Sequence, residues 1–335
     1  MEKIKCAIIG YGPAFNMGKA HADSINATGE MEVVAICDRD KSRTDAAKMD
    51  FPKVQTFNSV DDLLRNCDFQ LAVIVTPHNT HYPIAMQCLS AGKHTIVEKP
   101  FCITYKEASD MIDMAREKGV MLSVFHNRRW DGDYLALKEA VSKGLIGDIF
   151  HLEVFMGGYG HPGYWWRSDK ETSGGALYDW GAHIVDWILG LVPSKVKRVG
   201  GFSHKLVWKD VTNEDNAEAI IQFENGAVAY VQLSSIAMAG KRRWFILGTE
   251  GSLEDGRERQ GFLMRRIVNG MQMEGNIPFK KGEWNAYYKN IADHLLRGKE
   301  LVVKPEEARR VIAVIELAGK SAEEGQFIEF PQELY

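Results

Sequence analysis

Asp179 and His183 stand four residues apart in an apolar stretch of helical length, Gly175–Leu189. Residues four apart share one face of a helix, so the sequence predicts the carboxylate and the imidazole side by side. An imidazole oriented by a carboxylate can act as a general base near neutral pH. The same spacing suits an exposed helix pair that contributes only about 0.2–0.5 kcal/mol, and the residues alone leave both interpretations open.

The rest of this stretch divides between two faces. Asp186 and Trp187 continue the face of His183. Helical spacing on another face predicts packing against a sheet for Leu177, Trp180, Ile184, Ile188 and Leu191. An Asp and a His four apart also occur at metal sites, but no third ligand of suitable spacing stands in the sequence, so we expect no metal.

Lys99 lies directly after the short β-branched run His94–Val97, in the tripeptide Glu98-Lys99-Pro100. Thr76-Pro77 follows another such run, Leu71–Val75. Ligands of doubly wound sheets bind beyond the carboxyl ends of the strands, so we expect Lys99 to point toward a cofactor crevice. A partly desolvated amine at that place can take part in proton transfer. The alternative is a solvated lysine that pairs with Glu98.

A glycine-rich turn follows the first apolar run, Cys6–Ile9. The pattern G-x-G-x-x-G between a strand and a helix lets backbone N–H groups approach a pyrophosphate at the helix N-terminus. Gly10 and Gly12 fit this pattern. Phe15 stands where the third glycine is expected, and Gly18 comes three residues later. We interpret this as a three-residue insertion with Gly18 packing at the helix start; a turn that only joins strand and helix is the alternative.

Asp38 follows the second apolar run, Val33–Cys37, and lies 20 residues after Gly18. A carboxylate at this place accepts hydrogen bonds from the adenosine ribose of a dinucleotide. The alternative is a surface Asp that starts a turn or caps the next helix. Together with the glycine turn, Asp38 predicts dinucleotide binding, and its charge favours NAD because it repels a 2′-phosphate. Arg39 is adjacent and could turn to accept that phosphate, so NADP remains possible.

The overall composition disfavours several classes of protein. The chain has 335 residues, with 41 Lys and Arg against 45 Asp and Glu, so its net charge is −4. A mildly acidic chain has no general attraction for nucleic acid or for an anionic membrane surface. The sequence shows no signal-peptide pattern and no apolar run of about 18 residues. Its five scattered cysteines predict reduced core thiols, and we expect a cytoplasmic protein.

Strand and helix signals alternate over residues 1–125. Short apolar runs that predict buried strands are Cys6–Ile9, Val33–Cys37, Leu71–Val75, His94–Val97 and Met121–Phe125. Helix-length amphipathic stretches between them are Lys19–Ala27, Ser42–Met49, Val60–Asn66, Tyr82–Ala91 and Tyr105–Lys118. Such alternation predicts βαβ units and an α/β domain with a doubly wound parallel sheet.

Residues 126–335 predict an α+β domain with an open, mainly antiparallel sheet. Its expected helices are Asp133–Lys143, Gly175–Leu189, Glu283–Arg297 and Pro305–Ala322. Its expected strands are Asp148–Met156, Ala217–Phe223, Ala227–Leu233 and Arg243–Leu247. Glu224-Asn225-Gly226 is a strong hairpin signal between two of these strands. The helix at about 305–322 could pack back on the first domain.

Several motifs occur together in an order typical of one family. The chain reads Thr76-Pro77-His78-Asn79-Thr80-His81, then Ala91-Gly92-Lys93 ahead of Glu98-Lys99-Pro100, and later Gly174-Gly175 ahead of Asp179-x-x-x-His183. With Gly248-Thr249-Glu250-Gly251 included, it resembles the glucose–fructose oxidoreductase/inositol dehydrogenase (Gfo/Idh/MocA) family over nearly its whole length. The stretched glycine turn departs from the family's pattern.

The resemblance implies a Rossmann domain and an NAD(P)-dependent oxidoreductase acting on a sugar, polyol or related cyclic carbohydrate. His183 resembles the base that takes the hydroxyl proton, with Asp179 and Lys99 as the other catalytic residues. Residues expected at the cofactor are Gly10, Gly12, Phe15, Asn16, Met17, Gly18, Asp38, Arg39, Thr76, Pro77, Asn79, His81, Glu98, Lys99 and Pro100. An NAD-dependent glycosidase and a sugar- or NAD-sensing regulator are alternatives on the same fold; the regulator would lack the lysine or the histidine.

Two further segments are candidates for contact with a substrate. Asn127-Arg128-Arg129-Trp130 follows the last strand of the first domain, where either arginine could contact cofactor or substrate or form a domain-linking salt bridge. The loop from Tyr159 to Arg167 is dense in aromatics, on which the C–H faces of sugars can stack; ordinary packing is the alternative. The residues expected at the substrate are Lys99, Arg128, Trp166, Arg167, Asp179 and His183.

The strands of the second domain carry apolar residues on both faces. Ala219, Ile221 and Phe223 alternate with Ile220, while Val228 and Tyr230 alternate with the other residues of their strand. One face can cover the helix Gly175–Leu189, and no other helix is obviously available for the second face. Relatives in the resembled family bury that face against another subunit. We therefore expect a homodimer or homotetramer.

Overall fold

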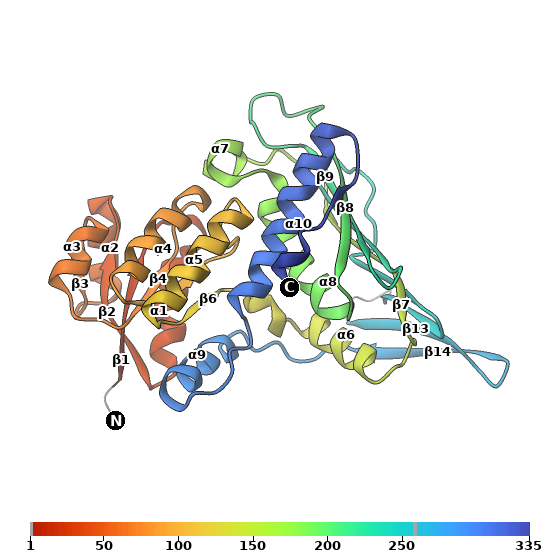
Figure 1. Cartoon of the computed structure of the whole chain (residues 1–335), viewed down its shortest axis with the longest axis horizontal. Helices are drawn as coiled ribbons and strands as arrows, with labels where there is room; N and C mark the ends of the chain where they lie inside the picture. Colours follow the sequence, from red (N-terminus) through yellow and green to blue (C-terminus); the bar gives the residue numbers. More distant parts are fainter. Residues whose placement is uncertain (1–2, 257–259) are drawn as a thin grey trace. The chain divides into compact units, whose positions relative to one another are not determined.

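The structure, a computed structural model of the chain, describes residues 3–256 and 260–335. These residues form two compact units (Figure 1). The first comprises the chain up to His126 together with Asn285–Arg309, and the second comprises Asn127–Trp284 and Arg310–Tyr335. The segment Asn285–Arg309 was expected in the second domain but packs with the first.

The first unit contains, within its described residues, a six-stranded sheet in the order β3-β2-β1-β4-β5-β6. Every strand pair in it is parallel, which confirms the doubly wound prediction. The strands are β1 (Ile4–Ile9), β2 (Met31–Cys37), β3 (Gln55–Phe57), β4 (Leu71–Ile74), β5 (His94–Val97) and β6 (Leu122–Val124). All five predicted apolar runs coincide with strands whose centres are buried, because both faces of a parallel sheet are covered.

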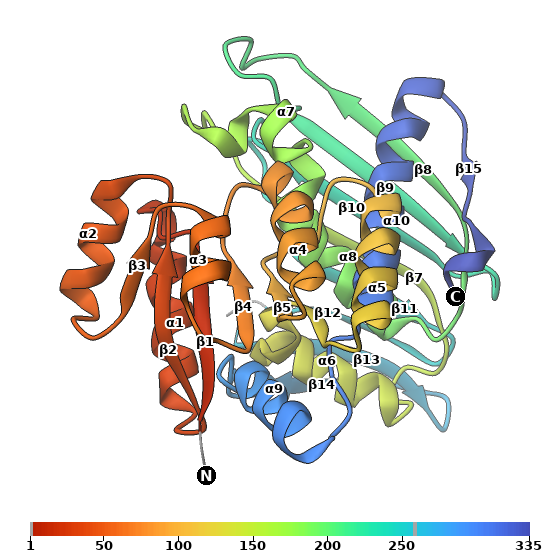
Figure 2. The same ribbon diagram turned by 60° about the vertical axis from the view of Figure 1, so that its left-hand side comes forward.

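The helices of this unit are α1 (Met17–Ala27), α2 (Lys41–Asp50), α3 (Val60–Asn66), α4 (His81–Ser90), α5 (Tyr105–Lys118) and α9 (Ala286–Arg297). Their ends follow the local sequence: Thr104 and Glu107 form a capping box at the start of α5, and Gly119 ends it in the left-handed conformation. Figure 2 shows α3, α4 and α5 side by side over one face of the sheet. The five cysteines are free and buried, and burial raises the pKa of Cys37 to about 12.

The second unit is built on a nine-stranded sheet, counted over the described residues, in the order β14-β13-β12-β11-β7-β10-β9-β8-β15. The strands are β7 (Ile149–Gly157), β8 (Val196–His204), β9 (Asn216–Phe223), β10 (Val228–Ser234), β11 (Trp244–Gly248), β12 (Gly251–Asp255), β13 (Gly261–Val268), β14 (Met271–Pro278) and β15 (Ile328–Glu329). The pairing is antiparallel except between β7 and β10, which run parallel. The predicted hairpin is confirmed: Glu224–Gly226 joins β9 to β10, with Gly226 at φ +89°.

The helices of the second unit are α6 (Gly132–Ser142), α7 (Lys170–Ser173), α8 (Trp180–Leu191) and the part of α10 (Pro305–Glu324) that follows Arg309. Helix α8 contacts β7 and β10 and is buried along most of its length. The backbone N–H of Gly201 on β8 donates to the Ser321 hydroxyl of α10 at 2.9 Å. Helices α8 and α10 thus pack on the sheet in the second unit (Figure 2).

The two faces of this sheet differ as the alternation predicts. Ala219, Ile221 and Val231 are buried, and they lie on the face that α8 covers. Ile220 is only half-buried, and Tyr230 is 40 % exposed on the opposite face. In the part of the chain that the structure describes, no helix is long and apolar enough to cross a membrane.

Candidate active site

The glycine turn between β1 and α1 is closely packed against the end of β4. Gly10 has φ +102°, and a Cβ there would lie closer than 3.0 Å to the carbonyl oxygen of Val75. Its N–H donates to the Cys37 carbonyl oxygen at 2.8 Å, which ties the turn to the end of β2. Gly12 has open space where a Cβ would be. The turn therefore leaves backbone accessible above the strand ends, where a pyrophosphate binds in such folds.

Gly18 occupies the packing position of the third glycine. A Cβ on Gly18 would lie 2.7 Å from the carbonyl oxygen of Gly10, so α1 can approach the turn only because this residue has no side chain. Phe15 and Asn16 have φ of +58° and +48°, and the side chain of Phe15 is 69 % exposed. Asn16 is the residue before α1 and makes no side-chain cap there. The insertion forms a short bulged turn, η1 (Ala14–Asn16), ahead of a helix start that carries no side-chain cap.

Asp38 lies immediately after β2 and faces the glycine turn. Its Oδ2 accepts a hydrogen bond from the backbone N–H of Tyr11 at 2.7 Å, and its Oδ1 accepts one from Asp40 at 3.0 Å. A carboxylate has about four acceptor positions, so two ribose hydroxyls can still donate to it. Arg39 is exposed beside it. The structure thus brings Asp38 and the turn together, as the sequence predicts for a dinucleotide site.

The loops after β4 and β5 are joined by His81, the first residue of α4. Its Nδ1 lies 2.8 Å from the carbonyl oxygen of Pro100, and its Nε2 lies 2.9 Å from that of Thr76. The Thr80 hydroxyl donates to the Thr76 hydroxyl at 2.8 Å. His81 is fully buried, so its observed role is to hold the two strand-end loops together. Pro77 is half-buried in the loop after β4, and Asn79 is exposed in η2 (His78–Thr80).

Lys99 follows β5 and is half-buried, whereas Glu98 before it is buried. The peptide bond between Lys99 and Pro100 is cis. The Oε2 of Glu98 accepts the backbone N–H of Lys99 at 2.8 Å. Lys99 is thus fixed through its backbone at the carboxyl edge of the parallel sheet, where the sequence predicts it.

Asp179 and His183 do not share a continuous helix, contrary to the predicted helix Gly175–Leu189. A short turn, η5 (Ala176–Tyr178), comes first, and Asp179 has φ −82° and ψ −90°, which lies outside the helical region. Helix α8 begins after it, so Asp179 is the N-cap residue and His183 lies in the first turns. Two glycines with positive φ, Gly174 and Gly175, turn the chain just upstream. The break places the Asp179 carboxylate at the helix start, where negative charge is favourable.

The two residues have different surroundings. His183 is buried, and its ring meets that of Trp180 in a T-shaped contact at 5.8 Å. The Asp179 carboxylate is 40 % exposed and accepts a short charged hydrogen bond from Arg167. The Arg167 guanidinium also lies over the ring of Trp166, 4.8 Å from its centroid. Arg167, Trp166 and Asp179, all predicted at the substrate, are therefore one contiguous group in the second unit.

Trp180 differs from its predicted role as a residue packed on the sheet. It is half-buried, with the guanidinium of Arg128 4.4 Å and that of Arg243 5.7 Å from its ring centroid. Arg128 also pairs with Asp131 at 2.9 Å. Trp180 thus presents an aromatic ring with two cations beside His183. The sequence shows the helical spacing of Trp180 but not its contact with Arg243, because Arg243 lies 63 residues away in the chain.

Arg129 has a structural partner inside the second unit. Its guanidinium makes two parallel hydrogen bonds, at 2.6 and 2.8 Å, with the carboxylate of Asp186 on α8. Asp186 is 3 % exposed, so this bidentate pair fixes η3 (Asn127–Trp130) against the helix of His183. Asp186 and Trp187, predicted on the face of His183, are both buried.

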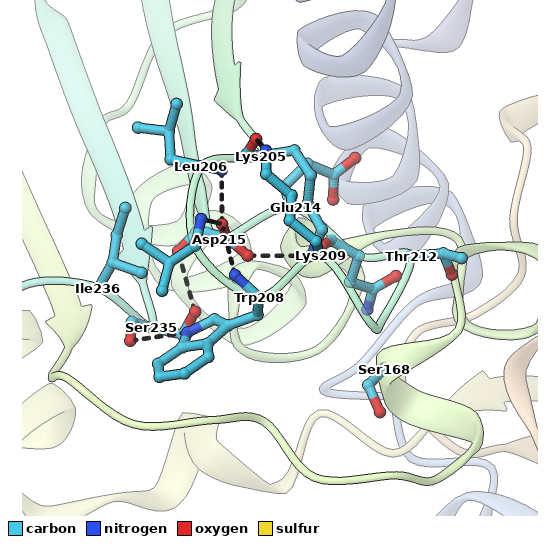
Figure 3. A network of polar contacts seen from close by, with 12 residues as sticks. Ser168, Lys205, Leu206, Trp208, Lys209, Thr212, Glu214, Asp215, Ser235 and Ile236 are labelled. Atoms are coloured by element: carbon cyan, nitrogen blue, oxygen red, sulfur yellow. Dashed lines mark hydrogen bonds and ion pairs between the residues drawn. The ribbon is translucent and has the colours of Figure 1, made fainter.

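A loop that the sequence did not single out supports the aromatic loop. It runs from Lys205 to Asp215, and the buried Asp215 carboxylate binds several groups of the loop (Figure 3). Oδ2 of Asp215 accepts backbone N–H groups of Leu206 and Val207, each at 2.6 Å, and Oδ1 accepts the Lys205 ammonium at 2.9 Å. No sequence motif marks Asp215, because most of its partners are backbone groups.

The same loop holds the segment around Arg167. The side-chain amide of Asn213 donates to the Arg167 carbonyl oxygen at 2.6 Å, and its backbone N–H donates to Ser168. The carboxylate of Glu214 accepts the Ala176 N–H at 2.8 Å, just before Asp179. The Lys205–Asp215 loop therefore positions both partners of the Arg167–Asp179 pair.

We expect Asp215→Asn to lower the free energy of unfolding at pH 7 by about 1.5–3 kcal/mol, because the hydrogen bonds of a buried charge are weakened. Burial alone would raise the pKa of Asp215, but the N–H groups of Val207 and Leu206 and the Lys205 ammonium outweigh it and hold the pKa below its ordinary value. A lowered folded-state pKa stabilises the fold above the unfolded pKa of about 3.9 and ceases to do so as the pH falls through the folded value.

Urea titrations of the wild type and the variant at several pH values measure this difference. The two stabilities should differ by the full amount at pH 7 and 5 and should converge below about pH 4. A difference that stays constant down to pH 3 would show that the charge of Asp215 is not what stabilises the loop.

No group of three or more His, Cys, Asp or Glu side chains that could hold a metal ion occurs among the residues that the structure describes.

Comparison with known proteins assigns both parts of the chain. Residues 4–126 match the model described as "Oxidoreductase family, NAD-binding Rossmann fold", and residues 134–254 match the "GFO/IDH/MocA C-terminal domain". The first match spans the six-stranded sheet, so this sheet belongs to an NAD-binding Rossmann domain. The glycine turn and Asp38 fit that assignment, since both meet at the ends of β1 and β2.

Similar proteins cover nearly the whole chain. "Scyllo-inositol 2-dehydrogenase (NADP(+)) IolW" of Bacillus subtilis is 29% identical, over 98% of this chain and 96% of its own length. "Uncharacterized oxidoreductase C26H5.09c" of Schizosaccharomyces pombe is 32% identical, over 75% of this chain and 70% of its own. The crystal structure of an "NAD-binding protein" from Listeria innocua superposes with a TM-score of 0.89 at 26% identity, covering 98% of this chain and 100% of that one.

Proposed function

Because the chain belongs to the Gfo/Idh/MocA family of NAD(P)-dependent oxidoreductases, we propose that it is a dehydrogenase that oxidises a CH–OH group of a sugar, polyol or related cyclic carbohydrate. The observation that supports this proposal is that each unit carries one of the two chemical groups that such a reaction needs. Lys99 is fixed at the carboxyl edge of the NAD-binding sheet, and His183 lies in the first turns of α8 beside aromatic and cationic side chains.

In the proposed mechanism, the glycine turn and the start of α1 bind the pyrophosphate, and Asp38 accepts hydrogen bonds from the adenosine ribose. The bound nicotinamide supplies the hydride acceptor. An imidazole nitrogen of His183 takes the hydroxyl proton of the substrate, and Lys99 Nζ donates a hydrogen bond to the same oxygen. Asp179, held by Arg167 at the start of α8, supports the protonated His183 by its negative charge.

The carbohydrate class is supported by two features. The aromatic loop presents Tyr159 and Tyr164, 49 % and 79 % exposed, with Trp166 and Arg167 next to Asp179. Aromatic faces and paired polar side chains are the usual means of binding sugar rings. The Bacillus subtilis relative is named for an inositol, a cyclic polyol. We propose Arg128, Trp166 and Arg167 as substrate-binding residues.

A panel of inositols, other polyols, aldoses and glycosides, each assayed with NAD and with NADP, tests the proposal. A dehydrogenase accumulates reduced cofactor in proportion to the alcohol consumed, and the absorbance of the reduced nicotinamide measures it. Cleavage of a glycoside without net accumulation of reduced cofactor would show a glycosidase instead. Binding of cofactor without turnover of any member, with Lys99 and His183 intact, would contradict a catalytic role on this class.

We propose that the chain prefers NAD and that Asp38 sets this preference. Asp38→Ala is expected to weaken NAD binding by about tenfold and to improve the relative use of NADP, because a ribose acceptor and a negative charge are lost together. Fluorescence titration with NADH and NADPH measures both affinities, and Asp40→Ala is the control for removing a neighbouring charge. Tighter binding of NADP than of NAD by the wild type would show that Arg39 governs the site, as the cofactor named for the Bacillus subtilis relative would suggest.

We also propose that the chain forms a homodimer or a dimer of dimers through the open face of the second unit's sheet. That face presents Ile220, Tyr230 and Phe245 among charged side chains such as Glu153 and Lys241, around a shallow hollow. Light scattering at micromolar concentration is expected to give a dimer or tetramer mass, and Ile220→Arg with Tyr230→Glu should reduce it to that of the monomer. A wild-type monomer at that concentration would refute the proposed interface.

A further inference from the structure

A chain of buried polar side chains lies behind Lys99. His21 on α1 places Nε2 2.9 Å from Oε1 of Glu98 and Nδ1 2.5 Å from the Tyr288 hydroxyl on α9. The second oxygen of Glu98 accepts the backbone N–H of Lys99. His21, Tyr288 and Glu98 are 1 %, 0 % and 8 % exposed, so these bonds form out of contact with bulk water.

The hydrogen bonds define the role of each group. An ionised carboxylate can only accept, so Nε2 of His21 must donate to Glu98. In the neutral ring, Nδ1 is then the acceptor, and the Tyr288 hydroxyl donates to it. Each polar atom of His21 therefore has one partner, and Phe125 packs on its ring at 4.3 Å between centroids. The imidazole is held in one orientation by two hydrogen bonds and by ring contacts with Phe125 and Tyr288.

The charge of Glu98 depends on this arrangement. Burial alone would raise the pKa of Glu98, but the hydrogen bond from His21 and the nearby charge of Lys99 outweigh it and hold the pKa below its ordinary value. The other titratable groups near His21 and Glu98 are Tyr288, Tyr287 and Cys6. Burial raises the pKa of Tyr288 well above its ordinary value. None of these three supplies a positive charge near neutral pH, so after removal of His21 only Lys99 remains to offset the effect of burial on Glu98.

We propose that His21, held in place by Tyr288, is a positioning residue that holds the Glu98 carboxylate behind Lys99. The carboxylate then holds Lys99 through its backbone N–H and places a negative charge near its ammonium. This proposal depends on the proposed function only because it takes Lys99 as the active-site lysine. Since α1 begins at the glycine turn, the His21–Glu98 bond also fixes the register of that helix against the end of β5.

The direct test measures the charge environment of Lys99 without any turnover. Acetic anhydride acetylates only the neutral amine, so the pH dependence of Lys99 labelling, followed by mass spectrometry with the exposed Lys53 as internal reference, gives a labelling midpoint. The variants are His21→Phe, Glu98→Gln, the double variant and His21→Gln, whose amide can still donate to Glu98. The free protein is used throughout.

We expect His21→Phe and Glu98→Gln each to move the labelling midpoint of Lys99 down by at least about 0.5 pH unit, because the nearby negative charge of Glu98 is lost in both. The double variant should move it no further, and His21→Gln should keep the wild-type midpoint. An unchanged midpoint in His21→Phe, or a further downward shift in the double variant, would overturn the proposal. Where His21→Phe fails to fold, His21→Asn, whose shorter amide is out of reach of Glu98, takes its place in the same comparison.

Steady-state kinetics of the holoenzyme then separate this role from a merely structural one. We expect His21→Phe to lower kcat at least about tenfold while the substrate KM and the NADH Kd change less than about threefold. His21→Gln should recover most of kcat. If the wild type turned over no carbohydrate, the proposed function would fail while the labelling result still decided the role of His21. Equal losses of kcat and of NADH affinity in His21→Phe would point to general disruption instead and would contradict the proposal.

Discussion

Replacing Lys99 with Met or His183 with Ala is expected to reduce kcat by at least about 10²-fold, the usual contribution of an acid–base group. Met keeps the length of the lysine stem but cannot donate to the reacting oxygen. Ala leaves a buried space at His183 and no group to take the hydroxyl proton. Cofactor affinity should change much less, since the glycine turn and Asp38 are untouched.

Turnover of the best substrate in the panel, together with NADH titration, measures the two effects separately. Lys41→Met on α2 and His204→Ala on β8 are matched controls, because both side chains are exposed and take no part in the proposed site. Near-wild-type kcat in Lys99→Met or His183→Ala would remove that residue from the mechanism.

Gly10→Ala is expected to weaken NADH binding by about 10²-fold, the scale of a misplacement of about 1 Å in a binding site. The new Cβ would lie closer than 3.0 Å to the Val75 carbonyl oxygen, which is backbone and cannot turn away. The turn must therefore move off the end of β4, and the N–H groups that we propose bind the pyrophosphate move with it. A lower Tm should accompany the change.

Gly92→Ala is the matched control. Gly92 also has a positive φ, +72°, but nothing lies within 4 Å of a Cβ built on it. This variant carries the backbone strain of about 1 kcal/mol without the steric contact. It should bind NADH as the wild type does, and equal affinities for Gly10→Ala and Gly92→Ala would show that the close approach of Gly10 has no part in binding.

The fold of the first unit was predictable because most of its strands are short apolar runs, which indicate buried strands of a parallel sheet. The exception is β3, whose Gln55 and Thr56 are exposed and lack the apolar signal of the other strands. In the second unit, β13 and β14 were not predicted; most residues of both strands are half-buried or exposed, although β13 is rich in apolar residues. β13 pairs with β12 and β14 pairs with β13, and one sequence does not reveal these pairings.

The candidate site was predictable where a local motif marks it. The glycine turn, Asp38 and Lys99 all follow predicted strands, and the structure places them at strand ends. The break before α8 was not predicted, because a run of apolar residues hides the non-helical backbone at Asp179. His21 and Asp215 were not singled out, since their partners are Tyr288, 267 residues away, and backbone groups.

The first unit is not a continuous piece of the chain, and this affects how it is made. Tyr288, which seats His21, and Val303, whose carbonyl oxygen accepts the Ser123 hydroxyl, belong to Asn285–Arg309. A ribosome adding about 5–20 residues per second must synthesise roughly 160 further residues after His126 before this segment exists. The nascent nucleotide-binding sheet therefore remains for about 8–32 s with His21 and Ser123 lacking these partners. Its final consolidation comes late in translation, after nearly all of the second unit has been synthesised.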